Sequence, residues 1–110
     1  MSNIANTALG MIEKATGQYD CSGFVVYCYQ QNGINNVPHS SSQIWAQGSS
    51  GDGSAGDIVC WDGHVGICDG NGNVIHSYNS NHNISKNKCI NSYHKIKCWY
   101  NIHIKTINTK

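Results

Sequence analysis

The hydrophobic pattern of this 110-residue chain changes its period once, and that change limits the folds open to it. Before residue 48, apolar residues recur at helical spacing. The segment 48–56 reads GSSGDGSAG, a flexible surface loop that is too short to separate two domains. Three short β-rich runs follow it, at 56–62, 64–69 and 73–79. Helices followed by an antiparallel sheet predict an α+β architecture.

Two of the three expected helices lie near the start and near the end of the N-terminal half of the chain. Residues 4–15 place apolar side chains at helical spacing, and Gly17 follows as a stop. A loop is predicted over 34–42 around the single proline, and residues 42–47 predict a short third helix.

The second helix is expected to begin at Cys21, because Asp20 is a good N-cap residue. Apolar residues then recur at helical spacing until Gly33, which predicts the C-terminal stop. Cys28 lies on the apolar stripe of this helix, so we expect it to be a core residue.

The last third of the chain is expected to complete the sheet. The Asn-rich stretch 79–91 predicts a long hairpin or loop, and residues 93–107 alternate well enough for one or two closing strands. With 110 residues, the chain 1–110 is expected to form a single domain with its function in one cleft or on one face.

Charge and hydropathy exclude several classes of function. Seven Lys and Arg against six Asp and Glu give a net charge of +1, which provides no strong field for nucleic acid or an anionic membrane. No segment approaches the roughly 20 apolar residues of a membrane span. The first residues lack the basic and apolar regions of a signal peptide, so we expect synthesis in the cytoplasm without one.

Six cysteines in so short a chain allow a disulfide framework, a metal site or free thiols. Their spacing contains no CxxC pair and no finger-like Cys-His arrangement, so no metal site is expected. We expect mostly free, structural thiols. This includes the neighbouring-strand pair Cys60 and Cys68, although they are near enough to bridge. The six are Cys21, Cys28, Cys60, Cys68, Cys89 and Cys98.

Cys21 has three possible roles: nucleophile, one end of a disulfide, or small core residue. A thiol is nucleophilic as thiolate, and a helix N-terminus stabilises thiolate without a metal. The backbone N–H of Cys21, unpaired in the first turn, is also suited to donate to an oxyanion. Ser22 and Gly23 leave this helix end unhindered for a substrate carbonyl.

A base for Cys21 is expected from the β-rich half. A five-residue loop 69–73 pairs position 66 with 76, which makes His64 and His76 diagonal neighbours on one face of the sheet. A two-residue turn shifts the register and brings Asn79 opposite His64 instead. His76 is therefore the expected partner that orients His64, with Asn79 as the alternative.

Four separated motifs resemble the NlpC family of papain-like cell-wall cysteine peptidases over about residues 18–79. They are DCSGFVVY, SSSQIWAQG, GDIVCW and HVGICDGNGNVIHS. The resemblance implies a papain-like α+β catalytic domain with its nucleophile at a helix N-terminus. It also implies Cys21 as nucleophile, His64 as general base and His76 as the third polar residue. The expected reaction begins with His64 holding Cys21 as a thiolate.

The resemblance also implies a substrate, the peptidoglycan stem peptide, and no metal or organic cofactor. The bond most often cut in the family joins γ-D-glutamyl to a diamino acid. Asp20 and Ser22 match positions that contact substrate in some members, and Tyr78 shares the strand parity of the two histidines. We expect these three residues at the substrate, although Asp20 also serves as an N-cap.

The sequence is also compatible with other functions. An N-acetylmuramoyl-L-alanine amidase uses the same Cys-His apparatus on another bond. An inactive wall-peptide-binding module or a thiol-rich metal binder belongs to a different class. We expect a monomer that acts at the bacterial wall after release or export, as a phage-type lysin or an effector, and an effector would have an immunity protein as partner.

Overall fold

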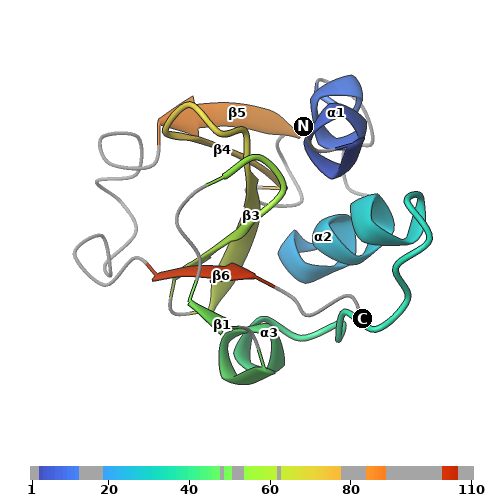
Figure 1. Ribbon diagram of the computed structural model, residues 1–110, viewed down its shortest axis with the longest axis vertical. Helices are drawn as coiled ribbons and strands as arrows, with labels where there is room; N and C mark the ends of the chain where they lie inside the picture. Colours follow the sequence, from blue (N-terminus) through green and yellow to red (C-terminus); the bar gives the residue numbers. More distant parts are fainter. Residues whose placement is uncertain are drawn as a thin grey trace.

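The computed structural model describes residues 3–12, 19–47, 49–50, 54–61, 63–77, 84–88 and 103–106. In these residues three helices pack with a six-stranded antiparallel sheet (Figure 1), which confirms the expected α+β class. The elements are α1 (Asn3–Gly10), α2 (Cys21–Gln30), α3 (Ser41–Gln47), β1 (Ser49–Ser50), β2 (Ile58–Trp61), β3 (His64–Cys68), β4 (Asn73–His76), β5 (Ser85–Lys88) and β6 (His103–Thr106).

Helix α2 begins and ends as the sequence predicts. The backbone of Asp20 is extended, and its carboxylate accepts a hydrogen bond of 2.6 Å from the N–H of Gly23. After Gln30 the chain turns through Gly33, whose φ of +80° suits glycine. Cys28 is fully buried, as expected for a core residue.

Helix α1 is shorter than predicted. It ends at Gly10 rather than near residue 15, and Met11 and Ile12 follow in a turn. Their N–H groups bond to the carbonyls three residues earlier, 3.0 Å to Ala8 and 3.3 Å to Leu9. Glycine loses more backbone entropy than other residues when it enters a helix. The α-helix therefore ends readily at Gly10 and continues as a tighter turn. The remainder of the predicted segment, from residue 13, lies outside the described residues.

The strand order of the sheet is β1-β6-β2-β3-β4-β5. Strands β2, β3 and β4 match the three predicted runs, and β6 lies in the region predicted to close the sheet. Strand β1 was not anticipated, because it lies within the segment 48–56 that we predicted as a loop. Strand β5 lies within 79–91, where we predicted a hairpin or loop, and it pairs with β4.

The β3–β4 connection adopts the first of the two predicted registers, with Cys68 opposite Val74 and Ile67 opposite Ile75. Asp69 holds this loop together. Its carboxylate accepts hydrogen bonds from the backbone N–H groups of Asn71 and Asn73, at 2.7 and 3.1 Å, and from the Asn73 amide at 2.8 Å.

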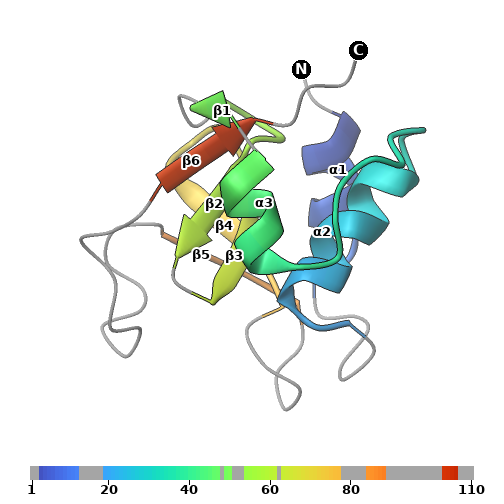
Figure 2. The same cartoon turned by 90° about the horizontal axis from the view of Figure 1, so that it is seen from below.

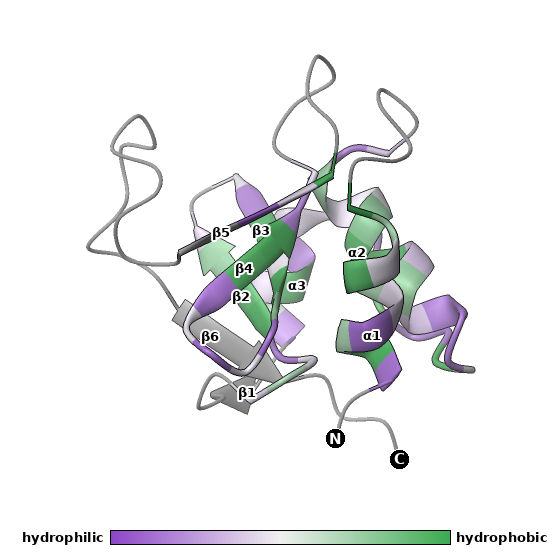
Figure 3. Cartoon of the chain, turned by 90° about the horizontal axis from the view of Figure 1, so that it is seen from above, coloured by the Kyte–Doolittle hydropathy of each residue, from purple (hydrophilic) through white to green (hydrophobic). Residues whose placement is uncertain are grey.

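Two clusters of buried apolar side chains follow from strand alternation. The larger joins α1 and α2 to one face of the sheet, and Figure 3 shows hydrophobic stretches on α2 and on the central strands. The smaller cluster comprises Val59, Trp61, Cys68 and Val74. Helix α3 contacts β2 (Figure 2), with Ile44 buried and Trp45 39% exposed.

The four cysteines of the described residues are free thiols: Cys21, Cys28, Cys60 and Cys68. Cys60 belongs to the larger cluster and Cys68 to the smaller one. Alternation therefore points their side chains to opposite faces of the sheet, which does not suit a disulfide between them. Cys89 and Cys98 lie outside the described residues.

Candidate active site

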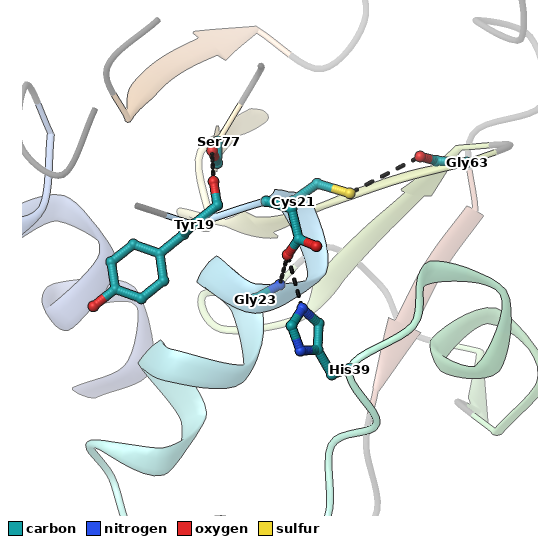
Figure 4. A network of polar contacts seen from close by, with 7 residues as sticks. Tyr19, Cys21, Gly23, His39, Gly63 and Ser77 are labelled. Atoms are coloured by element: carbon teal, nitrogen blue, oxygen red, sulfur yellow. Dashed lines mark hydrogen bonds and ion pairs between the residues drawn. The ribbon is translucent and has the colours of Figure 1, made fainter. Parts of the chain in front are cut away.

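The hairpin between β2 and β3 organises the site. Two residues separate the strands, Trp61 lies directly opposite His64, and Gly63 turns the chain with a φ of +78°. The carbonyl oxygen of Gly63 accepts a long hydrogen bond of 3.9 Å from Sγ of Cys21 (Figure 4). This one turn therefore contacts the N-terminus of α2 and positions the first residue of β3.

Cys21 is partly buried against the larger apolar cluster. Burial raises the pKa of its thiol above the ordinary value of 9.0. The backbone N–H groups of Val65 and Ser22 lower this pKa, whereas the negative charge of Asp20 raises it. The N–H groups thus favour the thiolate, but burial has the larger effect and the pKa of Cys21 is raised.

His64 and His76 lie together as the sequence predicts. Nε2 of His64 is 2.6 Å from Nδ1 of His76, with ring centroids 4.8 Å apart and planes at 67°. The close approach depends on Gly66, because a Cβ there would meet the side chain of Val74 and lie 2.8 Å from Cβ of His76. His76 is fully buried, and burial lowers the pKa of His64 from 6.5 to about 4.

The resting state differs from the expected thiolate held by His64. In the described part of the chain, the Cys21 thiol bonds to Gly63, one residue before His64, and not to the imidazole. The raised pKa of Cys21 and the lowered pKa of His64 both favour the neutral forms. Burial is the largest cause of both shifts, so a neutral thiol and a neutral imidazole are favoured at rest.

Asp20 has a second partner that the sequence did not reveal. Oδ1 of Asp20 bonds to the Gly23 N–H and also lies 2.8 Å from Nε2 of His39 (Figure 4). The hydrogen bond from His39 is the largest influence that lowers the pKa of Asp20. His39 lies in the loop before α3, and no sequence pattern marked it as part of a site.

Ser77 links the two halves of the site from a position that no sequence pattern marked. Its hydroxyl, 4% exposed, donates a hydrogen bond of 2.6 Å to the backbone carbonyl of Tyr19 (Figure 4). Ser77 directly follows His76, and Tyr19 lies two residues before Cys21. This hydrogen bond thereby joins the end of β4, which carries His76, to the segment that leads into α2.

The predicted substrate contacts have different positions. Asp20 is exposed at the N-cap, whereas Ser22 in the first turn of α2 is 6% exposed. Tyr78 and the alternative orienting residue Asn79 lie outside the described residues. The observed β3–β4 register is the one that makes His64 and His76 diagonal neighbours.

Neither a metal site nor a membrane span is found in the described residues. No group of three or more His, Cys, Asp or Glu side chains there is arranged to bind a metal ion. Among the same residues, no helix has the length and apolar character that crossing a bilayer requires.

Two relatives from Corynebacterium glutamicum, one of them from strain R, are each named "Probable endopeptidase". Each is 41% identical to this chain over 80 residues, a match that covers 66% of this chain. The match covers 38% of one relative and 37% of the other, so the chain spans well under half of their length. The model of the NlpC/P60 family matches residues 8–103, and the chain therefore belongs to the NlpC/P60 family.

Proposed function

We propose that this chain is a cysteine peptidase domain that hydrolyses an amide bond in the stem peptide of peptidoglycan. The bond between γ-D-glutamyl and a diamino acid is the proposed target. The main support is the imidazole pair of His64 and His76 at 2.6 Å, together with the contact between Cys21 and Gly63, the residue before His64. The relatives named as endopeptidases support the same class of reaction.

The tautomers of His64 and His76 follow from the proposed role of His64 as the base. To accept a proton from Cys21, His64 must have one unprotonated nitrogen that faces away from His76. Its Nε2 is the atom that contacts His76, so Nδ1 is the accepting atom and Nε2 carries the hydrogen. Nε2–H of His64 then donates to Nδ1 of His76, which fixes both rings.

The reaction begins when the Cys21 thiol turns from the Gly63 carbonyl toward Nδ1 of His64. The thiol proton passes to Nδ1 while Sγ bonds to the substrate carbonyl carbon, and the carbonyl electrons move onto its oxygen. The backbone N–H of Cys21 donates to that oxyanion. When the carbonyl re-forms, the C–N bond breaks, and the leaving amine takes the proton from His64. Water then hydrolyses the thioester.

A neutral Cys21 thiol and a neutral His64 imidazole at rest suit this sequence of steps. The imidazolium of His64 is costly in a buried site, but it forms together with the negative charge of the tetrahedral intermediate. The two opposite charges stabilise each other where water is excluded. The hydrogen bond from His64 to His76 also becomes charge-assisted at this moment, and such bonds are about twice as strong as neutral ones.

Digestion of purified peptidoglycan followed by mass analysis tests the proposal. New amino groups on the diamino acid are expected. New N-terminal L-alanine would instead assign an N-acetylmuramoyl-L-alanine amidase, and binding without cleavage would assign an inactive module. We place the action at the bacterial wall, reached by release or export.

A matched pair of variants tests the nucleophile. Cys21→Ala should abolish cleavage while the circular dichroism spectrum is unchanged. Cys28→Ala lies in the same helix, but its side chain is buried in the core, so this control should lose stability and keep its activity. Normal cleavage by the Cys21→Ala protein would exclude the cysteine mechanism.

A further inference from the structure

Trp61 is a buried aromatic residue that contacts both imidazoles. Its ring centroid lies 5.5 Å from that of His64, with the planes at 37°, and 6.2 Å from that of His76, at 31°. The side chain is only 2% exposed. Trp61 is the cross-strand partner of His64, so the short β2–β3 turn fixes the indole beside that imidazole.

The face of an indole ring attracts a cation that lies within about 6 Å of its centroid, and tryptophan does so best among the aromatic residues. His64 is neutral at rest and becomes a cation only after it accepts a proton. The attraction is therefore small in the resting site and larger during the reaction. An interaction that strengthens in this way lowers the barrier rather than improving substrate binding.

We propose that Trp61 is a positioning residue that holds the imidazole of His64 against its indole face and stabilises the imidazolium form of that histidine. Its catalytic consequence rests on the proposed function. Its effect on the protonation of His64 does not, because proton binding is measurable without any substrate.

Trp61 has two opposing effects on His64. As an apolar wall it contributes to the burial that lowers the pKa of His64, and as a π face it favours the charged form. Among the described residues, two titratable groups are linked to the His64 site: His76 on β4 contacts its ring, and Cys21 bonds to the carbonyl of Gly63, the residue before it. The test must therefore change the π face and keep the apolar wall.

Two variants separate the π face from the apolar wall. Trp61→Leu keeps an apolar side chain but has no π face, and Trp61→Phe keeps a smaller π face. The pKa of His64 is measured by NMR of protein labelled in its histidine rings, and a His64→Gln sample identifies the resonance. We expect proton affinity to fall about three- to tenfold in Trp61→Leu, which is about 0.5 to 1 pKa unit, and less in Trp61→Phe. An unchanged or raised pKa in folded Trp61→Leu would overturn the proposal.

Fluorinated tryptophan provides a test that does not depend on the folding of a variant. Fluorine atoms withdraw charge from the ring face and alter its shape very little. The pKa of His64 should fall stepwise as fluorine atoms are added to tryptophan in otherwise unchanged protein. A pKa independent of fluorine number would show that the π face has no influence, and the proposal would be wrong.

Kinetics separate this inference from the proposed function. In Trp61→Leu, kcat should fall about three- to tenfold with KM nearly unchanged, because the contact strengthens only as His64 is charged. A rise in KM with constant kcat would contradict the inference. If the unaltered protein cleaves no peptidoglycan, the proposed function fails, and the two titrations still decide the effect of Trp61 on His64.

Discussion

Nε2 of His64 and Nδ1 of His76 lie 2.6 Å apart, and only one of these two nitrogens can carry the hydrogen between them. His76 is fully buried, so its ring is held by the surrounding protein and orients His64. The imidazole pair thus behaves as one unit, in which a change at His76 alters how His64 handles a proton.

Substitutions of His76 should show whether it orients His64 through a hydrogen bond or only fills space beside it. In His76→Asn the amide oxygen can accept the hydrogen bond that Nδ1 accepts, so activity should stay within about tenfold. His76→Ala removes the acceptor and should lower kcat by about 10²-fold with little change in KM. Steady-state kinetics on a synthetic stem peptide measure both variants. Equal losses in the two would argue against an orienting hydrogen bond.

Acid should destabilise the fold through His64. Its pKa is about 4 in the folded protein and 6.5 when unperturbed, so between these values the unfolded chain binds more protons than the folded one. The contribution is fully favourable above pH 6.5, and up to about 3 kcal/mol of stability is lost as the pH falls toward 4. Urea unfolding across this pH range measures the loss. The same series on His64→Gln should have a flatter profile, and identical profiles would contradict the assignment to His64.

Gly66→Ala should damage the site through packing. The added Cβ would meet Val74 and His76, so the neighbours must shift and His76 should move away from His64. Overpacking of this kind typically costs about 1–3 kcal/mol, and we expect a loss of activity as well. Gly10→Ala is the control, because the space around Gly10 is open and it lies at the end of a helix. Thermal unfolding and peptide cleavage are measured for both, and a stable, fully active Gly66→Ala protein would refute the prediction.

Asp20 should influence Cys21 in two separable ways. Asp20→Asn keeps an N-cap acceptor and removes the charge that raises the pKa of Cys21, so that pKa should fall. Asp20→Ala also removes the cap and should cost about 1 kcal/mol of stability. The pH dependence of Cys21 alkylation by iodoacetamide, located by peptide mass mapping, measures the first effect, and urea unfolding the second. A higher alkylation pKa in Asp20→Asn would contradict the charge effect.

Local signals predicted the framework of the site. The Asp20 cap placed Cys21 at the start of α2, and the alternating pattern with a five-residue loop brought His64 beside His76. Both depend on residues close together in the sequence, where spacing determines geometry.

Other features depend on contacts between distant residues and left no local signal. His39 meets Asp20 across 19 positions, and Ser77 meets Tyr19 across 58. The pKa shifts that favour the neutral forms of Cys21 and His64 also escaped prediction, because they result from burial, which the tertiary fold sets.

The strand order has a consequence for how the protein is made. Both histidines and Trp61 lie in the consecutive strands β2, β3 and β4, which can pair as soon as that segment leaves the ribosome. The outer edge of β2 is covered by β6, which comes much later in the chain. Until β6 is synthesised, this edge exposes unpaired backbone groups beside an apolar strand. Nascent chains at this stage are therefore the most exposed to aggregation and to premature pairing with one another.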